Sequence, residues 1–146
     1  MRIKPAHIYV GASSNEIDRA VRCMQMLKSA GFIVTSTWPA TIANVGDANP
    51  RDASTVDRCT WASSDFRELD QADTFWMLVP SVGTGRGAYA ELGYAKGRDK
   101  LTLSSGDTKQ SIFCALTAEF VDDIEAFATL CKWAREGVDV LSPVLS

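Results

Sequence analysis

The chain has 146 residues, 46% of them hydrophobic and 23% charged, which are the proportions of an ordinary globular protein of one domain. A net charge of −3 without a long basic run argues against a nucleic-acid surface. No apolar run reaches the roughly 18 residues of a membrane span. We therefore expect one domain over residues 1–146, cytoplasmic, with neither nucleic acid nor a membrane as partner.

Four cysteines and a single histidine give little basis for a metal site or a nucleophilic site. The cysteines are widely spaced and form no CxxC pair, which argues against a zinc site or a disulfide framework and predicts buried, reduced thiols. His7 precedes the first expected strand and is a poor partner for a catalytic serine or cysteine. The cysteines are Cys23, Cys59, Cys114 and Cys131.

Apolar runs alternate with helical patterns along the chain, which predicts an α/β fold with a doubly wound, parallel, five-stranded sheet. The first strand, helix and second strand form a βαβ unit whose connection should be right-handed. We expect a Rossmann-like or flavodoxin-like domain with strand order 2-1-3-4-5. The expected strands are residues 8–10, 32–37, 75–79, 101–103, and 112–116 together with 120–121. Four helices are expected: one that begins after residue 13, one over residues 54–71, one from the glycine-rich turn to residue 97, and one over residues 122–136.

Boundary signals mark the first helix and the segment after the second strand. Ser13 and Glu16 fit a capping box, in which each side chain bonds the other residue's backbone N–H. Gly31 suits the end of that helix. Residues 38–53 are broken by prolines and a glycine, which predicts a loop. A loop after the carboxyl end of a strand is a candidate cover for a ligand, although an ordinary surface excursion explains it nearly as well.

A glycine-rich turn after the third strand is the strongest functional signal. Gly83, Gly85 and Gly87 alternate there, and Glu91 is the one acid of the helix that follows. Glycines permit positive φ and close backbone approach to a ligand, and a helix N-terminus favours an anion. Glu91 would lie about one turn into the helix, partly exposed near the mouth of the site. A tight turn followed by a solvated glutamate is the alternative interpretation.

The expected strand order brings two turns to one crevice. In a doubly wound sheet, ligands bind at the carboxyl ends of the strands, beside the point where the strand order reverses. Residues 11–14 after the first strand and residues 81–87 after the third would flank that crevice. This convergence favours a ligand-binding role for the glycine-rich turn. Asp65 lies in the helix between these strands, and its spacing alone indicates a solvated carboxylate.

Three segments carry a family resemblance. They are Ile8-Tyr9-Val10-Gly11-Ala12, then Asp65 followed eight residues later by Asp73, and finally Gly87-Ala88-Tyr89-Ala90-Glu91-Leu92-Gly93-Tyr94-Ala95. Their order and spacing resemble the nucleoside 2-deoxyribosyltransferase family, with its relatives that hydrolyse the N-glycosidic bond of deoxynucleoside 5′-monophosphates. The last segment is similar to the family's Gly-x-x-x-Glu-Leu-Gly-x-Ala signature and is the most specific. The resemblance covers most of the chain.

The resemblance implies an enzyme that cleaves the N-glycosidic bond through a covalent glycosyl intermediate on Glu91. The intermediate would pass to another base or to water. Tyr9 would orient the nucleophile, and Asp65 would handle the base or the proton of the leaving group. The implied partners are a deoxynucleoside or deoxynucleotide, a nucleobase and further copies of the chain in a homo-oligomer. No metal or organic cofactor is implied.

The sequence departs from the family pattern at the sugar site. Transferases of the family commonly carry an acid six residues before the nucleophile, where Gly85 stands here. Hydroxyls, glycine N–H groups and an arginine nearby favour an anionic group, and therefore a nucleotide. Ser111 and Phe113 are candidates for a contribution across an oligomer interface. The expected substrate-binding residues are Gly11, Ser81, Gly83, Thr84, Gly85, Arg86, Gly87 and Ser111.

Two other functions remain open at this point. The missing acid at Gly85 is compatible with a Rossmann-like module that binds or senses a nucleotide without chemistry, and a plain interaction domain is the second alternative. On the enzyme interpretation, Glu91→Ala should abolish turnover and leave the fold intact. Gly87→Val should damage the turn by crowding it.

Overall fold

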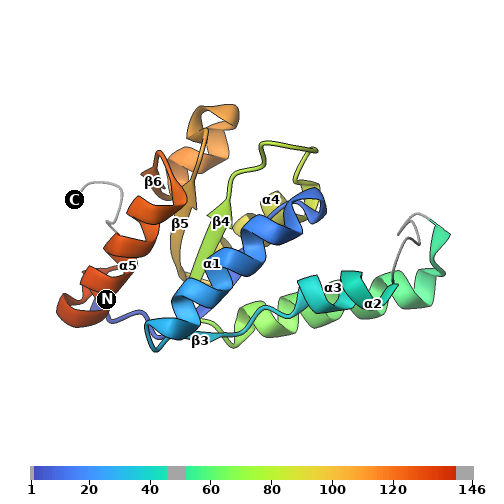
Figure 1. The fold of residues 1–146 in the computed structure, drawn as a ribbon, viewed down its shortest axis with the longest axis horizontal. Helices are drawn as coiled ribbons and strands as arrows, with labels where there is room; N and C mark the ends of the chain where they lie inside the picture. The colour runs from blue at the N-terminus through green and yellow to red at the C-terminus, as the bar shows by residue number, and fades with distance from the viewer. Residues whose placement is uncertain (1, 46–51, 141–146) are drawn as a thin grey trace.

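A five-stranded parallel sheet forms the centre of the structure, as the alternating pattern predicted (Figure 1). The computed structural model describes residues 2–45 and 52–140. The strand order is β3-β2-β4-β5-β6, which is 2-1-3-4-5 when these five strands are counted among themselves along the chain. The strands are β2 (His7–Gly11), β3 (Ile33–Val34), β4 (Thr74–Leu78), β5 (Leu101–Ser105) and β6 (Ala118–Phe120).

Helices cover both faces of the sheet (Figure 1). The first and last helices pack against each other, and the third and fourth form a second pair. No helix within the described ranges is long and apolar enough to cross a membrane. A short antiparallel pair, which the sequence did not predict, joins the two ends of the domain. The helices are α1 (Ile17–Ser29), α2 (Trp38–Val45), α3 (Thr55–Asp70), α4 (Arg86–Gly97) and α5 (Asp123–Glu136), and the pair is β1 (Arg2–Ile3) with β7 (Val138–Asp139).

Strand β4 is the middle of the hydrophobic core. All five of its residues are buried, because a central parallel strand is covered by helices on both faces. Phe75 and Trp76 are fully buried, as is Tyr9 on the neighbouring strand β2. The rings of Tyr9 and Phe75 lie 5.9 Å apart, centroid to centroid. The core therefore fixes β2 and β4 side by side.

Three local predictions were wrong. Residues 38–45 of the predicted loop form α2, because Pro39 stands in the first turn of the helix, where its missing N–H needs no partner. The predicted second strand shrinks to Ile33–Val34. The predicted fifth strand lies at Ala118–Phe120, and Ile112–Leu116 forms a 3₁₀ helix instead. Ser111 caps that helix by accepting a hydrogen bond from the N–H of Phe113.

The predicted capping box does not form, because the Ser13 hydroxyl bonds the N–H of Asn15 and not that of Glu16. The Ser13 hydroxyl accepts a hydrogen bond from the N–H of Asn15 and caps a 3₁₀ turn, Ser14–Glu16, that leads into α1. The Glu16 side chain does not complete the box, because it bonds Ser81 and Val82 in the glycine-rich turn. Gly31 does follow the end of α1 with a φ of 95°, as predicted.

The glycine-rich turn depends on two of its three glycines. Gly83 and Gly85 have φ angles of 80° and 65°, which side-chain-bearing residues rarely adopt. A Cβ on Gly85 would also stand 2.1 Å from Cγ of Pro80. Gly87 is an ordinary helix residue with open space where a Cβ would be. The prediction that Gly87→Val crowds the turn is therefore wrong, and the constraint lies at Gly85.

We expect Gly85→Ala to destabilise the fold by roughly 2 kcal/mol, because the alanine would be strained at positive φ and would collide with Pro80. The matched control Gly87→Ala should change the free energy of unfolding by less than about 1 kcal/mol, since alanine suits a helix. Urea unfolding of both variants measures the difference. Equal losses would show that the turn does not need the left-handed conformation at Gly85.

Candidate active site

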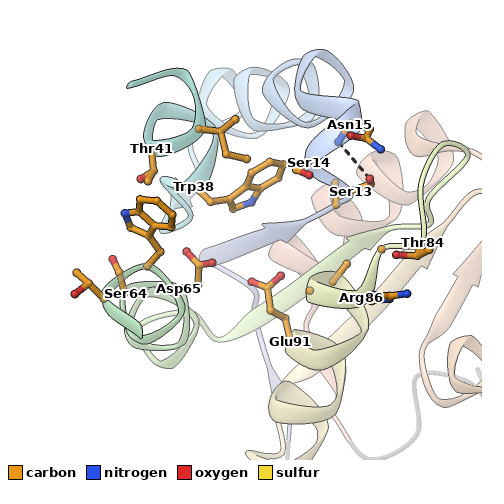
Figure 2. A pocket seen from close by; sticks show the side chains of 17 residues that line it. Ser13, Ser14, Asn15, Trp38, Thr41, Ser64, Asp65, Thr84, Arg86 and Glu91 are labelled. Atoms are coloured by element: carbon orange, nitrogen blue, oxygen red, sulfur yellow. Dashed lines mark hydrogen bonds between the residues drawn. The ribbon is translucent and has the colours of Figure 1, made fainter. Parts of the chain in front are cut away.

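A cavity of about 620 Å³ lies where β2 and β4 end, between the strands at which the order of the sheet reverses. Its size suits a small-molecule ligand. One wall consists of α2 and α3 with Trp38, Thr41 and Ser64, and the other consists of residues 12–15 and the start of α4. Figure 2 shows Glu91 between these walls, opposite Asp65.

Glu91 is a buried carboxyl group that faces this cavity, rather than the partly exposed residue that its position predicted. Only 8% of the residue is exposed. Gly11 makes room for it, because a Cβ there would lie 3.4 Å from Oε1 of Glu91 and 2.7 Å from Phe75. Burial raises the pKa of Glu91 to about 8; the nearby Tyr9 hydroxyl opposes this rise, and the carboxylates of Asp65 and Glu68 add to it.

Tyr9 lies on β2 close to Glu91, where it is fully buried and does not line the cavity. Burial and the Glu91 carboxylate raise the pKa of Tyr9 far above its ordinary value, so the side chain remains a neutral hydroxyl. The Tyr9 hydroxyl is close enough to lower the pKa of Glu91. Neither this hydroxyl nor Oε2 of Glu91, however, has a hydrogen bond of good geometry to any described residue. Buried polar atoms are normally paired. Both atoms therefore have unused hydrogen-bonding capacity, although neither is open to solvent in this structure.

Asp65 reaches the same cavity from α3. Burial, and to a smaller extent the Glu68 carboxylate, raises the pKa of Asp65 to about 6. Asp65 is therefore not the solvated carboxylate that its spacing indicated. Glu68 itself accepts hydrogen bonds from the backbone N–H and the hydroxyl of Thr37, just before α2. Two carboxyl groups with raised pKa values thus share one cavity, a combination that is common at catalytic sites.

The other predicted site residues divide into two groups. Four of them line the cavity: Thr84, Gly85, Arg86 and Gly87. Four do not: Gly11, Ser81, Gly83 and Ser111. Ser81 hydrogen-bonds to Glu16, and Ser111 caps the 3₁₀ helix. Gly11 and Gly83 contribute because they have no side chain, which leaves room for the side chains around them. The missing Cβ of Gly83 accommodates the side chains of Ser13 and Asn15.

Sequence reasoning missed most of the wall that α2 and α3 provide. Trp38 lines the cavity, and its Nε1 donates to the carbonyl of Val10 at the end of β2, over 2.8 Å. Trp61 lines it from α3. Trp61 and Asp65 are four residues apart, so they share one face of that helix, and this spacing is a signal that could have found the wall. Ala12, Ser13 and Ser14 line the cavity as part of the turn that was expected to flank it, and the remaining missed lining residues are Asn15, Thr41, Ile42, Thr60, Ser64 and Ala88.

Asp73 and His7 lie at the opposite ends of the strands from the cavity. Asp73 accepts hydrogen bonds from the N–H groups of Ala6 and His7 just before β4, so its role is to fix the start of β2. The described residues contain no cluster of three potential metal ligands. All four cysteines are free thiols, but Cys59 is exposed and Cys131 is half-buried, contrary to prediction.

Neither the family models nor the curated proteins give a match to this chain.

We expect Glu91→Gln to stabilise the protein increasingly as the pH rises from 5 to 8. The folded-state pKa of Glu91 lies above its unfolded value, so between about pH 4.5 and 8 the unfolded state ionises first, and this destabilises the wild type. The gain has an upper limit of roughly 5 kcal/mol at pH 8. Urea unfolding at three pH values measures it. A difference that stays constant across this range would contradict the burial argument, because any cost of the buried amide is independent of pH.

Proposed function

We propose that the protein cleaves the N-glycosidic bond of 2′-deoxynucleosides or their 5′-monophosphates through a covalent intermediate on Glu91. The observation that carries the proposal is the pairing of the buried Glu91 carboxyl with Asp65 across one cavity, with an unpartnered tyrosine hydroxyl beside Glu91. A carboxylate can stabilise an oxocarbenium-like sugar and then bond to it. The family resemblance of Tyr9, Asp65 and Glu91 supports the same assignment.

In the first step, the C1′–N bond breaks and its electron pair leaves with the base. A carboxylate oxygen of Glu91 bonds to C1′, and the Asp65 carboxyl group supplies a proton to the departing nitrogen. In the second step, water or a second base attacks C1′, the ester bond breaks, and Glu91 leaves as a carboxylate. Asp65 then accepts the proton of the attacking group. One proton shared between the two carboxyl groups suffices for both steps, and substrate binding has to move it from Glu91, which has the higher pKa in the empty site, to Asp65.

The cavity has two chemically different ends for such a substrate. The end with Trp38 and Trp61 offers aromatic surface to a flat base. In Figure 2, Thr84 and Arg86 lie on the other side of Glu91 from Asp65, with Ser13 and Asn15 nearby. Hydroxyls, a guanidinium and the N-terminus of α4 favour an anion there. A 5′-monophosphate would therefore place its base, sugar and phosphate in that order across the cavity.

A nucleotide-binding module without chemistry is the second candidate function. The pKa of Glu91 at about 8 keeps the empty site protonated at neutral pH, and a neutral carboxyl is a poor nucleophile. Saturable binding of a deoxynucleotide without release of base over a long incubation would favour this candidate. A homo-oligomer remains part of either proposal.

The deciding experiment incubates the protein with each deoxynucleoside and each deoxynucleoside monophosphate, with and without a second free base, and separates the products by chromatography. We expect base release in the wild type and a loss of at least about 10³-fold in Glu91→Gln, because the nucleophile is gone. Glu119→Gln, an exposed position in β6, is the matched control and should retain full activity. A new nucleoside that forms only with added base would identify a transferase. Full turnover by Glu91→Gln would refute the proposed nucleophile.

Arg86 tests the choice between nucleoside and monophosphate. We expect Arg86→Gln to lower kcat/KM for a 5′-monophosphate by roughly tenfold and to leave that for the nucleoside within twofold, because only the former loses a charge-assisted contact. The same product assay measures both substrates. Equal effects on the two would place the phosphate elsewhere.

A further inference from the structure

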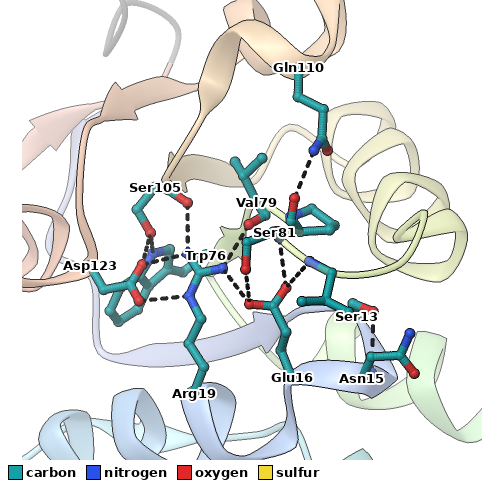
Figure 3. A network of polar contacts seen from close by, with 12 residues as sticks. Ser13, Asn15, Glu16, Arg19, Trp76, Val79, Ser81, Ser105, Gln110 and Asp123 are labelled. Atoms are coloured by element: carbon teal, nitrogen blue, oxygen red, sulfur yellow. Dashed lines mark hydrogen bonds and ion pairs between the residues drawn. The ribbon is translucent and has the colours of Figure 1, made fainter.

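The carboxylate of Glu16 is held by the glycine-rich turn itself. Its Oε1 accepts from the N–H of Ser81 at 2.8 Å and from the N–H of Val82 at 3.4 Å. Its Oε2 accepts from the Ser81 hydroxyl at 2.7 Å and from Nη1 of Arg19 at 3.2 Å. Figure 3 shows these contacts converging on one side chain.

This donor set is that of an anion site. Two successive backbone N–H groups, a hydroxyl and a guanidinium surround one position, which is how turns commonly bind phosphate or carboxylate groups. Burial alone would raise the pKa of Glu16, but the hydrogen bonds from Ser81, Val82 and Arg19 outweigh it and lower the pKa. The ionised carboxylate is therefore the form that the turn holds.

We propose that Glu16 is a built-in anionic ligand of the glycine-rich turn, filling an anion site made by Ser81, Val82 and Arg19. Ser81 is then a partner of Glu16 and not a contact for substrate phosphate, which corrects the expectation from the sequence. Glu16 is a positioning residue, because it does not line the cavity but fixes the turn that does.

The position of the turn matters because the turn bridges two parts of the cavity wall. Gly83 lies against Ser13 and Asn15, and Thr84 to Gly87 enter the cavity. Gln110 holds the other side of the turn by donating to the carbonyl of Pro80 at 2.7 Å. Loss of Glu16 should therefore displace the wall to which we assign the anionic end of the substrate. This consequence rests on the proposed function, whereas the anion site does not.

Glu16→Ala tests the anion site without reference to catalysis. The variant leaves a space of carboxylate size beside Ser81 and Val82, two exposed residues through which a small anion can enter. We expect sodium formate at roughly 100 mM to raise the Tm of Glu16→Ala by about 3–6 °C more than sodium chloride of equal ionic strength. The wild type and Glu125→Ala, an exposed glutamate of α5, should show no such difference.

Selective stabilisation by formate, or folding of Glu16→Ala only in its presence, would support the proposal. A folded Glu16→Ala that responds equally to formate and chloride would overturn it. In the product assay we expect KM of Glu16→Ala to rise about tenfold, with kcat within threefold of wild type, and formate to restore KM. If neither the wild type nor any variant releases base, the proposed function is wrong, and the formate experiment still tests the anion site.

Glu16→Gln keeps the shape and removes the charge. We expect the Tm of Glu16→Gln to lie below that of the wild type by the largest amount at pH 6, and the difference to shrink toward pH 3. The stabilisation by a carboxylate with a lowered pKa disappears as the carboxylate is protonated. The charged groups of this network are Arg19 on α1 and Asp123 on α5, and both are present in each protein. An equal loss at pH 3 and pH 6 would overturn the proposal even if Glu16→Ala does not fold.

Discussion

The guanidinium of Arg19 is the interaction on which the site end of the sheet depends. All five of its N–H groups are used: Asp123 accepts from Nε and Nη2, Glu16 from Nη1, and the carbonyls of Val79 and Ser105 from Nη1 and Nη2 (Figure 3). Those carbonyls lie at the ends of β4 and β5, and that of Ser105 also accepts a hydrogen bond from the N–H of Val79. The Arg19 side chain thus links β4 and β5 to α1 and α5, and its hydrogen bond to Glu16 positions the carboxylate that holds the turn.

The cavity shows a cost that functional sites commonly carry. Glu91 is buried, two of its neighbours are carboxylates, and Oε2 has no partner within the described part of the chain. A carboxyl group in such surroundings reduces the free energy of unfolding. The compensating stability lies beside the cavity, in the fully buried strand β4 and in the Arg19 network. On the proposed function, this destabilised carboxyl is the nucleophile.

Most of the fold could be predicted from hydrophobic periodicity, because buried parallel strands and amphipathic helices have distinct patterns. Glu91 and Asp65 were found through a family resemblance, and the structure brings both to one cavity. Glu16 was misread because a capping box is a local signature, whereas its partner Ser81 is 65 residues away along the chain. The helix that carries Trp38 was missed because the proline beside Trp38 indicated a loop. In both cases the deciding contact is tertiary.

The two walls of the cavity differ in how the chain holds them. The wall with Glu91 is fixed by β2, the glycine-rich turn and the Arg19 network, so a substitution there disturbs many contacts at once. The wall on α2 and α3 is held by other contacts, through Trp38 with Val10 and through the stacked rings of Phe66 on α3 and Tyr94 on α4. The lining residues of α2 and α3 other than Asp65 can therefore change while Glu91 and its supports stay in place. Descendants of this chain are expected to diverge in ligand preference through α2 and α3 first.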